Sequence, residues 1–114
     1  MNNNLKKKLK AGRTVYGTWC MLPSSFVVDA VASAGVDFVV IDMEHGAMSF
    51  ETAEEMVRAA EANGCQAIVR PTDAQEPTLL HALEIGARAV LVPHVESADL
   101  ARRVAAATRY FPDG

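Results

Sequence analysis

Short apolar runs alternate with amphipathic segments along this chain, and that alternation restricts its possible folds more than any other feature. The apolar runs cover residues 15–19, 36–41, 66–69 and 89–92. Runs of this length that contain β-branched residues are typical of strands, and the segments between them repeat apolar residues at helical spacing. Strands that alternate with helices predict an α/β fold with a parallel sheet and right-handed crossovers. Four such units make either a small open sheet or half of an eightfold barrel, and the periodicity does not choose between them.

Capping residues indicate where the helices begin. The predicted helices cover residues 5–11, 26–34 and 78–85, with one more that begins at Ser49 or Thr52 and a last one that Ser97 caps. Thr52 and Glu55 have the spacing of a capping box, whereas Ser49 offers a cap one turn earlier. Asn3 or Asn4 caps the first helix. A glycine inside the first strand, Gly17, is unusual for a strand interior.

The composition narrows the class of protein. The 114 residues suffice for one domain over residues 1–114, and half of them are hydrophobic. The net charge of -3 gives no reason to expect nucleic acid or an anionic membrane surface as a partner. No run of about 18 apolar residues or signal-peptide core is present, so we expect a cytoplasmic protein without a membrane span. Two cysteines, Cys20 and Cys65, are then expected to be reduced thiols.

A short basic run lies near the N-terminus. It contains Lys6, Lys7, Lys8 and Lys10. We interpret it as the solvated face of the first helix, since short charge runs usually have that role.

Polar side chains follow each predicted strand at its downstream end. They are Trp19 and Cys20 at the first strand, Asp42, Glu44 and His45 at the second, Arg70 at the third, and His94 and Glu96 at the fourth. In parallel α/β proteins the carboxyl ends of the strands carry the active site. The sequence therefore predicts a site at this edge of the sheet.

Three residues of this group have side chains suited to catalysis. His45 is a natural proton carrier, because imidazole titrates near neutral pH. Asp42 lies three residues earlier, and we expect its carboxylate to accept a hydrogen bond from the His45 ring and orient it. The alternative is that Asp42 caps the turn and His45 is a surface histidine. Arg70 suits a bidentate grip on a carboxylate or phosphate, the alternative being a structural ion pair with Glu44 or Glu84.

A metal site is a further hypothesis for this edge. Glu44, His45, His94 and Glu96 are residue types that bind divalent ions, but their spacing is not a recognised metal signature. We interpret His94 as a pocket-wall residue and Glu96 as an acid near the start of the last helix. The sequence contains no phosphate-cradling glycine loop.

Several stretches together resemble the HpcH/HpaI aldolase family, the metal-dependent class II pyruvate aldolases. The stretches are Leu9-Lys10-Ala11-Gly12, Gly17-Thr18-Trp19, Ile41-Asp42-Met43-Glu44-His45-Gly46, Val69-Arg70-Pro71, Val90-Leu91-Val92-Pro93-His94-Val95 and Thr108-Arg109-Tyr110-Phe111-Pro112. The resemblance implies the N-terminal half of a (β/α)8 TIM barrel, in which an N-terminal helix precedes four parallel βα units. It also implies reversible cleavage of 4-hydroxy-2-oxo acids to pyruvate and an aldehyde.

The resemblance assigns roles to individual residues. His45 would be the catalytic acid/base paired with Asp42, and Arg70 would hold the pyruvate carboxylate and stabilise the enolate. Trp19 would contribute to substrate binding, and Glu44 would lie near metal-bound water. The divalent metal, Mg2+, Mn2+ or Co2+, would take ligands beyond residue 114, so no residue here is carried over as a ligand. Glu84 stands where the family usually has Asp.

The length of the chain leads to further expectations. A form without the metal ligands should be weak or inactive, whereas the full-length protein would be a homo-oligomer. One alternative is a non-catalytic half-barrel that associates with itself or complements another chain. Another is a citrate-lyase-like or phosphoenolpyruvate-type barrel lyase.

Overall fold

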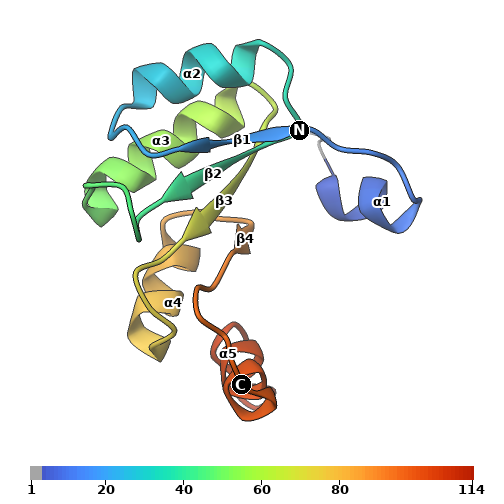
Figure 1. The fold of residues 1–114 in the computed structure, drawn as a ribbon, viewed down its shortest axis with the longest axis vertical. Helices are drawn as coiled ribbons and strands as arrows, with labels where there is room; N and C mark the ends of the chain where they lie inside the picture. Colours follow the sequence, from blue (N-terminus) through green and yellow to red (C-terminus); the bar gives the residue numbers. More distant parts are fainter. Residues whose placement is uncertain (1–3) are drawn as a thin grey trace.

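Four parallel strands form one sheet, in the order β1-β2-β3-β4, in the computed structural model, which describes residues 4–114 (Figure 1). The elements in chain order are α1 (Leu5–Lys10), β1 (Gly17–Cys20), α2 (Ser25–Ser33), β2 (Phe38–Asp42), α3 (Phe50–Ala62), β3 (Gln66–Arg70), α4 (Glu76–Glu84), β4 (Ala89–Val90) and α5 (Ala98–Ala107). The predicted α/β fold, a helix followed by four strand-helix units, is confirmed.

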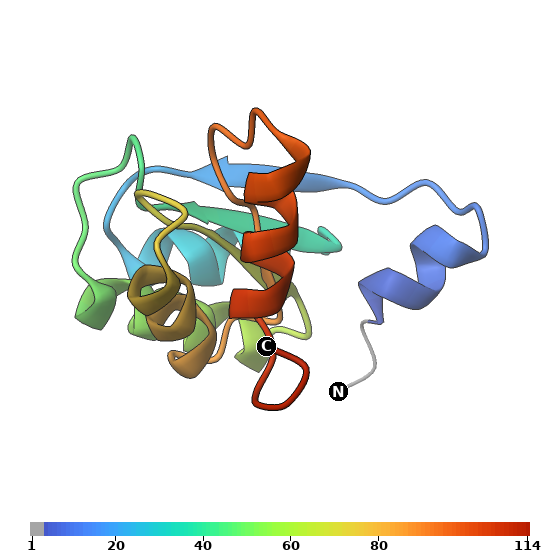
Figure 2. The same ribbon diagram turned by 90° about the horizontal axis from the view of Figure 1, so that it is seen from below.

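The two faces of the sheet have different environments. Side chains alternate along each strand, so Val39 and Ile41 on β2 point to the face opposite that of Val40 and Asp42. The helices α2, α3 and α4 lie on one side of the sheet (Figure 2). The fully buried core packs there. The opposite face carries the register pairs that lead to the site, among them Asp42 opposite Arg70.

Strand β1 runs over Gly17–Cys20, two residues later than the predicted start at residue 15. The presence of Gly17 in this strand has a steric explanation. A Cβ at Gly17 would lie 2.4 Å from the ring of Phe38, which is its register partner on β2. The unusual strand glycine therefore makes room for an aromatic ring on the neighbouring strand.

Strand β4 is shorter than predicted, since it covers only Ala89–Val90 of the expected residues 89–92. One more backbone hydrogen bond follows, from the Leu91 N–H to the Val69 carbonyl at 2.9 Å. Beyond it, Pro71 and Pro93 have no N–H to donate, so the ladder between β3 and β4 cannot continue.

The structure shows which of the predicted residues cap the helices. Ser49 caps α3, because its hydroxyl accepts the Thr52 N–H at 3.2 Å, so the alternative start at Thr52 is wrong. Asn4 caps α1, and Asn3 lies outside the described residues. Helix α4 begins at Glu76, two residues earlier than predicted. The Ser97 cap of α5 is confirmed.

One lysine of the basic run is not simply solvated. Lys8 forms an ion pair with Asp37, whose carboxylate also accepts the Tyr16 N–H at 2.9 Å. Asp37 lies directly before β2, so this contact holds α1 near the amino end of the sheet. The prediction that all four lysines are solvated is therefore wrong for Lys8, because a carboxylate lies within its reach.

Two further findings concern the cysteines and the helices. Cys20 and Cys65 are both buried free thiols. Across residues 4–114, every helix is too short or too polar to cross a lipid bilayer.

Candidate active site

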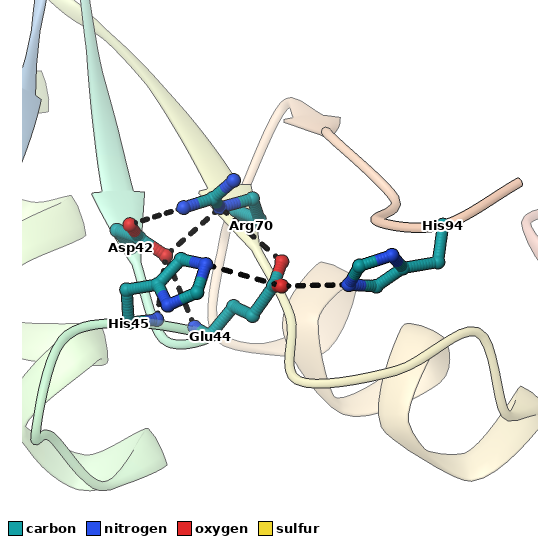
Figure 3. A network of polar contacts seen from close by, with 5 residues as sticks. All are labelled: Asp42, Glu44, His45, Arg70 and His94. Carbon is teal, nitrogen blue, oxygen red and sulfur yellow. Dashed lines mark hydrogen bonds and ion pairs between the residues drawn. The ribbon is translucent and has the colours of Figure 1, made fainter.

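Asp42 and Arg70 form a two-point ion pair at the carboxyl ends of β2 and β3 (Figure 3). The Arg70 Nε donates to Asp42 Oδ1 at 2.9 Å, and Nη2 donates to Oδ2 at 2.6 Å. The Asp42 side chain is 0% exposed and that of Arg70 is 20% exposed. Two parallel hydrogen bonds to a charged group fix the plane of the guanidinium as well as its position.

The same carboxylate organises the loop after β2. Asp42 Oδ1 accepts the backbone N–H of Glu44 at 3.0 Å and that of His45 at 3.2 Å. Gly46 closes this turn by donating its N–H to the Asp42 carbonyl at 3.0 Å. A Cβ at Gly46 would lie 2.1 Å from that carbonyl oxygen, so the turn requires glycine.

The expected pairing of Asp42 with the His45 ring is wrong in this structure. Asp42 contacts His45 through the backbone, while the ring Nε2 lies 3.3 Å from Glu44 Oε1. The physical reason is that Arg70 and the two amides already occupy both oxygens of Asp42. The sequence missed Arg70 as the partner of Asp42, although both residues end neighbouring strands.

This pairing shifts the titration of both partners. The hydrogen bond from Arg70 lowers the pKa of Asp42, with help from the backbone N–H groups of His45 and Glu44, against an opposing effect of burial. The hydrogen bond to Asp42 raises the pKa of Arg70. Both groups therefore remain charged at neutral pH.

Glu44 contacts residues from the carboxyl ends of three strands. Its Oε1 lies 3.0 Å from His94 Nε2 and 3.3 Å from His45 Nε2, and its Oε2 lies 3.6 Å from Arg70 Nε (Figure 3). The Glu44 side chain is only 13% exposed. Its Oε2 is the one buried side-chain oxygen or nitrogen within residues 4–114 that lacks a hydrogen-bond partner. The alternative interpretation of Arg70, an ion pair with Glu44, is therefore confirmed in addition to its pair with Asp42.

Trp19 brings β1 into the same group. The Arg70 guanidinium carbon lies 4.5 Å from the centre of the Trp19 ring, which is a cation–π contact. Trp19 is 49% exposed, so the ring also faces solvent. Asp42 occupies the edge of Arg70 formed by Nε and Nη2. Among residues 4–114 the structure gives no hydrogen bond to the other edge, which is formed by Nη1 and the second Nη2 hydrogen, and a guanidinium edge of this kind suits a second carboxylate.

Comparison with known proteins identifies the family of the chain. The sequence profile of the HpcH/HpaI aldolase/citrate lyase family matches residues 15–114. The chain belongs to the HpcH/HpaI aldolase/citrate lyase family. A "4-hydroxy-2-oxo-heptane-1,7-dioate aldolase" from Salmonella arizonae is 40% identical over 114 residues, which are 100% of this chain and 43% of the relative. A "Pyruvate aldolase" from Rhizobium etli is 36% identical over 112 residues, which are 98% of this chain and 44% of the relative.

A solved structure of similar sequence shares the fold. The citrate synthase SbnG superposes with a TM-score of 0.92 and 37% sequence identity, over 99% of this chain and 46% of that one. This HpcH/HpaI family chain thus spans less than half the length of the relatives it matches. Its four-stranded parallel sheet with flanking helices corresponds to that share of the family's barrel fold.

The metal implied by the family resemblance does not fit the residues at this site. Between residues 4 and 114 no group of three His, Cys, Asp or Glu side chains has an arrangement that holds a metal ion. The unpartnered Glu44 Oε2 is a single acceptor and does not amount to a ligand set. Among the contacts of residues 4–114, neither Glu84 nor Glu96 joins the cluster around Glu44.

Proposed function

We propose that this chain forms the substrate-holding part of an aldolase site that cleaves 4-hydroxy-2-oxo acids reversibly to pyruvate and an aldehyde. Family membership and the names of the relatives support this class of reaction. The observation that carries the proposal is the Asp42–Arg70 pair, which holds an open guanidinium edge beside Trp19 and next to Glu44 and His45.

Arg70 would bind the carboxylate of the 2-oxo acid. Cleavage leaves the electrons of the broken C3–C4 bond on the pyruvate fragment as an enolate. A fixed positive charge close to that enolate stabilises the transition state without reorganising. Asp42 keeps the guanidinium in place, because it holds two of the five N–H groups of Arg70.

His45 would carry the protons. Its ring is 64% exposed on the loop directly after β2 and contacts the same Glu44 carboxylate as Arg70, so it would lie near a substrate held by Arg70. In cleavage the base takes the proton of the 4-hydroxyl group, the C3–C4 bond breaks, and the aldehyde forms. The enolate then takes one proton at C3 to become the pyruvate methyl group.

Metal dependence is part of the proposal, with ligands supplied from outside residues 4–114. A homo-oligomeric full-length protein and a cytoplasmic location also stay predictions.

Exchange of the pyruvate methyl protons in D2O tests the function. The chain alone, with Mg2+, Mn2+ or Co2+, should exchange weakly or not at all. A chimera in which this chain replaces the matching residues of the Salmonella arizonae aldolase should exchange and should cleave a 4-hydroxy-2-oxo acid. His45→Ala should abolish both reactions in the chimera, and His81→Gln is the matched control. A folded chimera that exchanges equally well without His45 would overturn the assignment.

The self-associating half-barrel remains a second candidate. Strands β1 and β4 are the two edges of the sheet, and Trp19 and Leu91 expose apolar surface. Open edges and apolar patches favour pairing with another chain. Sedimentation velocity of the 114-residue chain tests it, and a well-behaved monomer would count against it. Activity against a panel of substrates would distinguish the citrate-lyase-like alternative from the aldolase.

A further inference from the structure

We propose that His94 is a positioning residue of this site, which holds the carboxylate of Glu44 and through it the ring of His45. The inference rests on the proposed function, because it concerns the proton carrier of that reaction. From the sequence, His94 was a pocket-wall residue or, in the metal hypothesis, a candidate ligand. The structure instead places its exposed ring against a largely buried carboxylate from a different strand end (Figure 3).

The contacts of Glu44 support this role. His94 Nε2 lies 3.0 Å from Glu44 Oε1, and the two residues are 50 positions apart in the sequence. Within residues 4–114 this is the hydrogen bond that the structure gives the Glu44 carboxylate, since Oε2 has none. Without His94, the Glu44 side chain would keep only its longer ion-pair contacts with His45 and Arg70.

The backbone at His94 is a second, independent observation. Its φ is 55°, and within residues 4–114 it is the one residue other than glycine with a positive φ. Such a conformation is unfavourable for a residue with a Cβ, so it persists where other contacts hold it. His94 comes directly after Pro93, in the segment that follows β4, and its ring contacts Glu44.

The arrangement also assigns the protons of the rings. Glu44 Oε1 is an acceptor, so His94 Nε2, which hydrogen-bonds to it at 3.0 Å, carries hydrogen when that ring is neutral. His45 Nε2 lies 3.3 Å from the same oxygen as an ion-pair contact, and we infer that a neutral His45 also keeps its hydrogen on Nε2, toward this carboxylate. The lone pair of a neutral His45 is then on Nδ1. We infer that Nδ1 is the atom that takes the substrate proton.

NMR of the 114-residue chain tests the inference without requiring activity. The chain has three histidines, so long-range 1H–15N spectra of the imidazole rings are assigned by single substitutions. At alkaline pH, where the rings are neutral, the wild-type spectrum should show His45 and His94 as the tautomer with hydrogen on Nε2. In His94→Ala the His45 ring should change to a mixture of tautomers, while His81 stays the same.

Two further variants guard against loss of folding. His94→Gly removes the ring and relieves the positive φ, so it should fold and should still alter His45. His94→Gln keeps a side-chain N–H donor and should restore the wild-type His45 spectrum. In a Glu44→Leu background, His94→Ala should add no further change, because the coupling runs through Glu44. An unchanged His45 spectrum in folded His94→Gly, or the same change in His94→Gln, would overturn the inference.

The two proposals fail in different ways. An active chimera whose His45 ring ignores His94 would remove the positioning role and leave the aldolase function. An inactive chimera whose His45 ring responds to His94 would keep the positioning role and remove the function.

Discussion

Asp42 and Arg70 are register partners on adjacent strands, and their side chains form two hydrogen bonds of 2.9 and 2.6 Å across them. Equal positions on neighbouring strands point to the same face of the sheet. The pair therefore links the alignment of β2 and β3 to the shape of the site. A change at either residue should affect both the stability of the sheet and the binding edge of Arg70.

Removal of the Asp42 charge should destabilise the chain strongly. We expect Asp42→Asn to lower the free energy of unfolding by about 3 kcal/mol, because it leaves a partly buried guanidinium without its counter-ion. The matched control is Glu54→Gln, which breaks the exposed i,i+4 pair with Arg58 and should cost less than about 0.5 kcal/mol. Urea unfolding monitored by circular dichroism measures both. Similar losses in the two variants would contradict a structural role for the buried pair.

Acid should weaken the fold through the same carboxylate. The pKa of Asp42 is lower in the folded chain than its ordinary value of 3.8, chiefly because of the hydrogen bond from Arg70. The stability it adds is therefore complete above the unfolded value and is lost as the pH falls below about 4 toward the folded pKa.

The unfolding free energy between about pH 2 and pH 6 measures this dependence. The slope on the acid side should decrease in Asp42→Asn. Asp37, whose pKa is lowered chiefly by Lys8, adds a contribution of the same sign, so Asp37→Asn is a useful comparison. An unchanged slope in Asp42→Asn would contradict the assigned direction.

Two glycines should respond differently to a methyl group. Gly17→Ala meets the ring of Phe38, which can shift, and we expect a loss of about 1–3 kcal/mol. Gly46→Ala meets the Asp42 carbonyl and the Met21 carbonyl, which are backbone atoms and cannot move separately. It should cost more and should distort the loop that carries Glu44 and His45. Denaturant midpoints compare the two, and an equal or smaller loss at Gly46 would contradict the geometry.

The single tryptophan offers a binding assay that does not depend on catalysis. Trp19 is the one Trp of the sequence and contacts Arg70, so pyruvate bound at the open edge of Arg70 should change its fluorescence. The change should saturate with concentration, whereas collisional quenching would not. Arg70→Lys should raise the dissociation constant for pyruvate about tenfold or more, because lysine lacks the planar guanidinium fork. A linear response, or equal affinity in Arg70→Lys, would count against this substrate grip.

The two thiols should be unreactive in the folded chain. Burial raises the pKa of Cys20, and burial, helped by the nearby Cys20 and Asp37, raises the pKa of Cys65 to about 11. Little thiolate is then present at neutral pH, and both side chains are only 3% exposed. A disulfide-exchange reagent should label them only as the chain unfolds in urea. Rapid labelling of either thiol under native conditions would contradict this.

The elements themselves could be predicted from the sequence because their signals are local. Strand periodicity, the cap at Ser97, and the strand-end position of the polar residues all depend on neighbours within a few positions. The errors occurred where two local signals competed or where a distant residue decided. Ser49 and Thr52 both satisfied the capping rule, and the close approach of Phe38 to Gly17 appears only once β1 and β2 are paired.

The sequence by itself determined the order of strands and helices and the edge of the sheet at which the site residues lie. Only the tertiary structure decided which of them pair, because pairing depends on the register of strands and on which oxygens are already occupied. Asp42 binds Arg70, 28 residues away, in place of the His45 ring three residues away. Glu44 in turn meets both His45 and His94, because the ends of β2 and β4 lie on either side of β3.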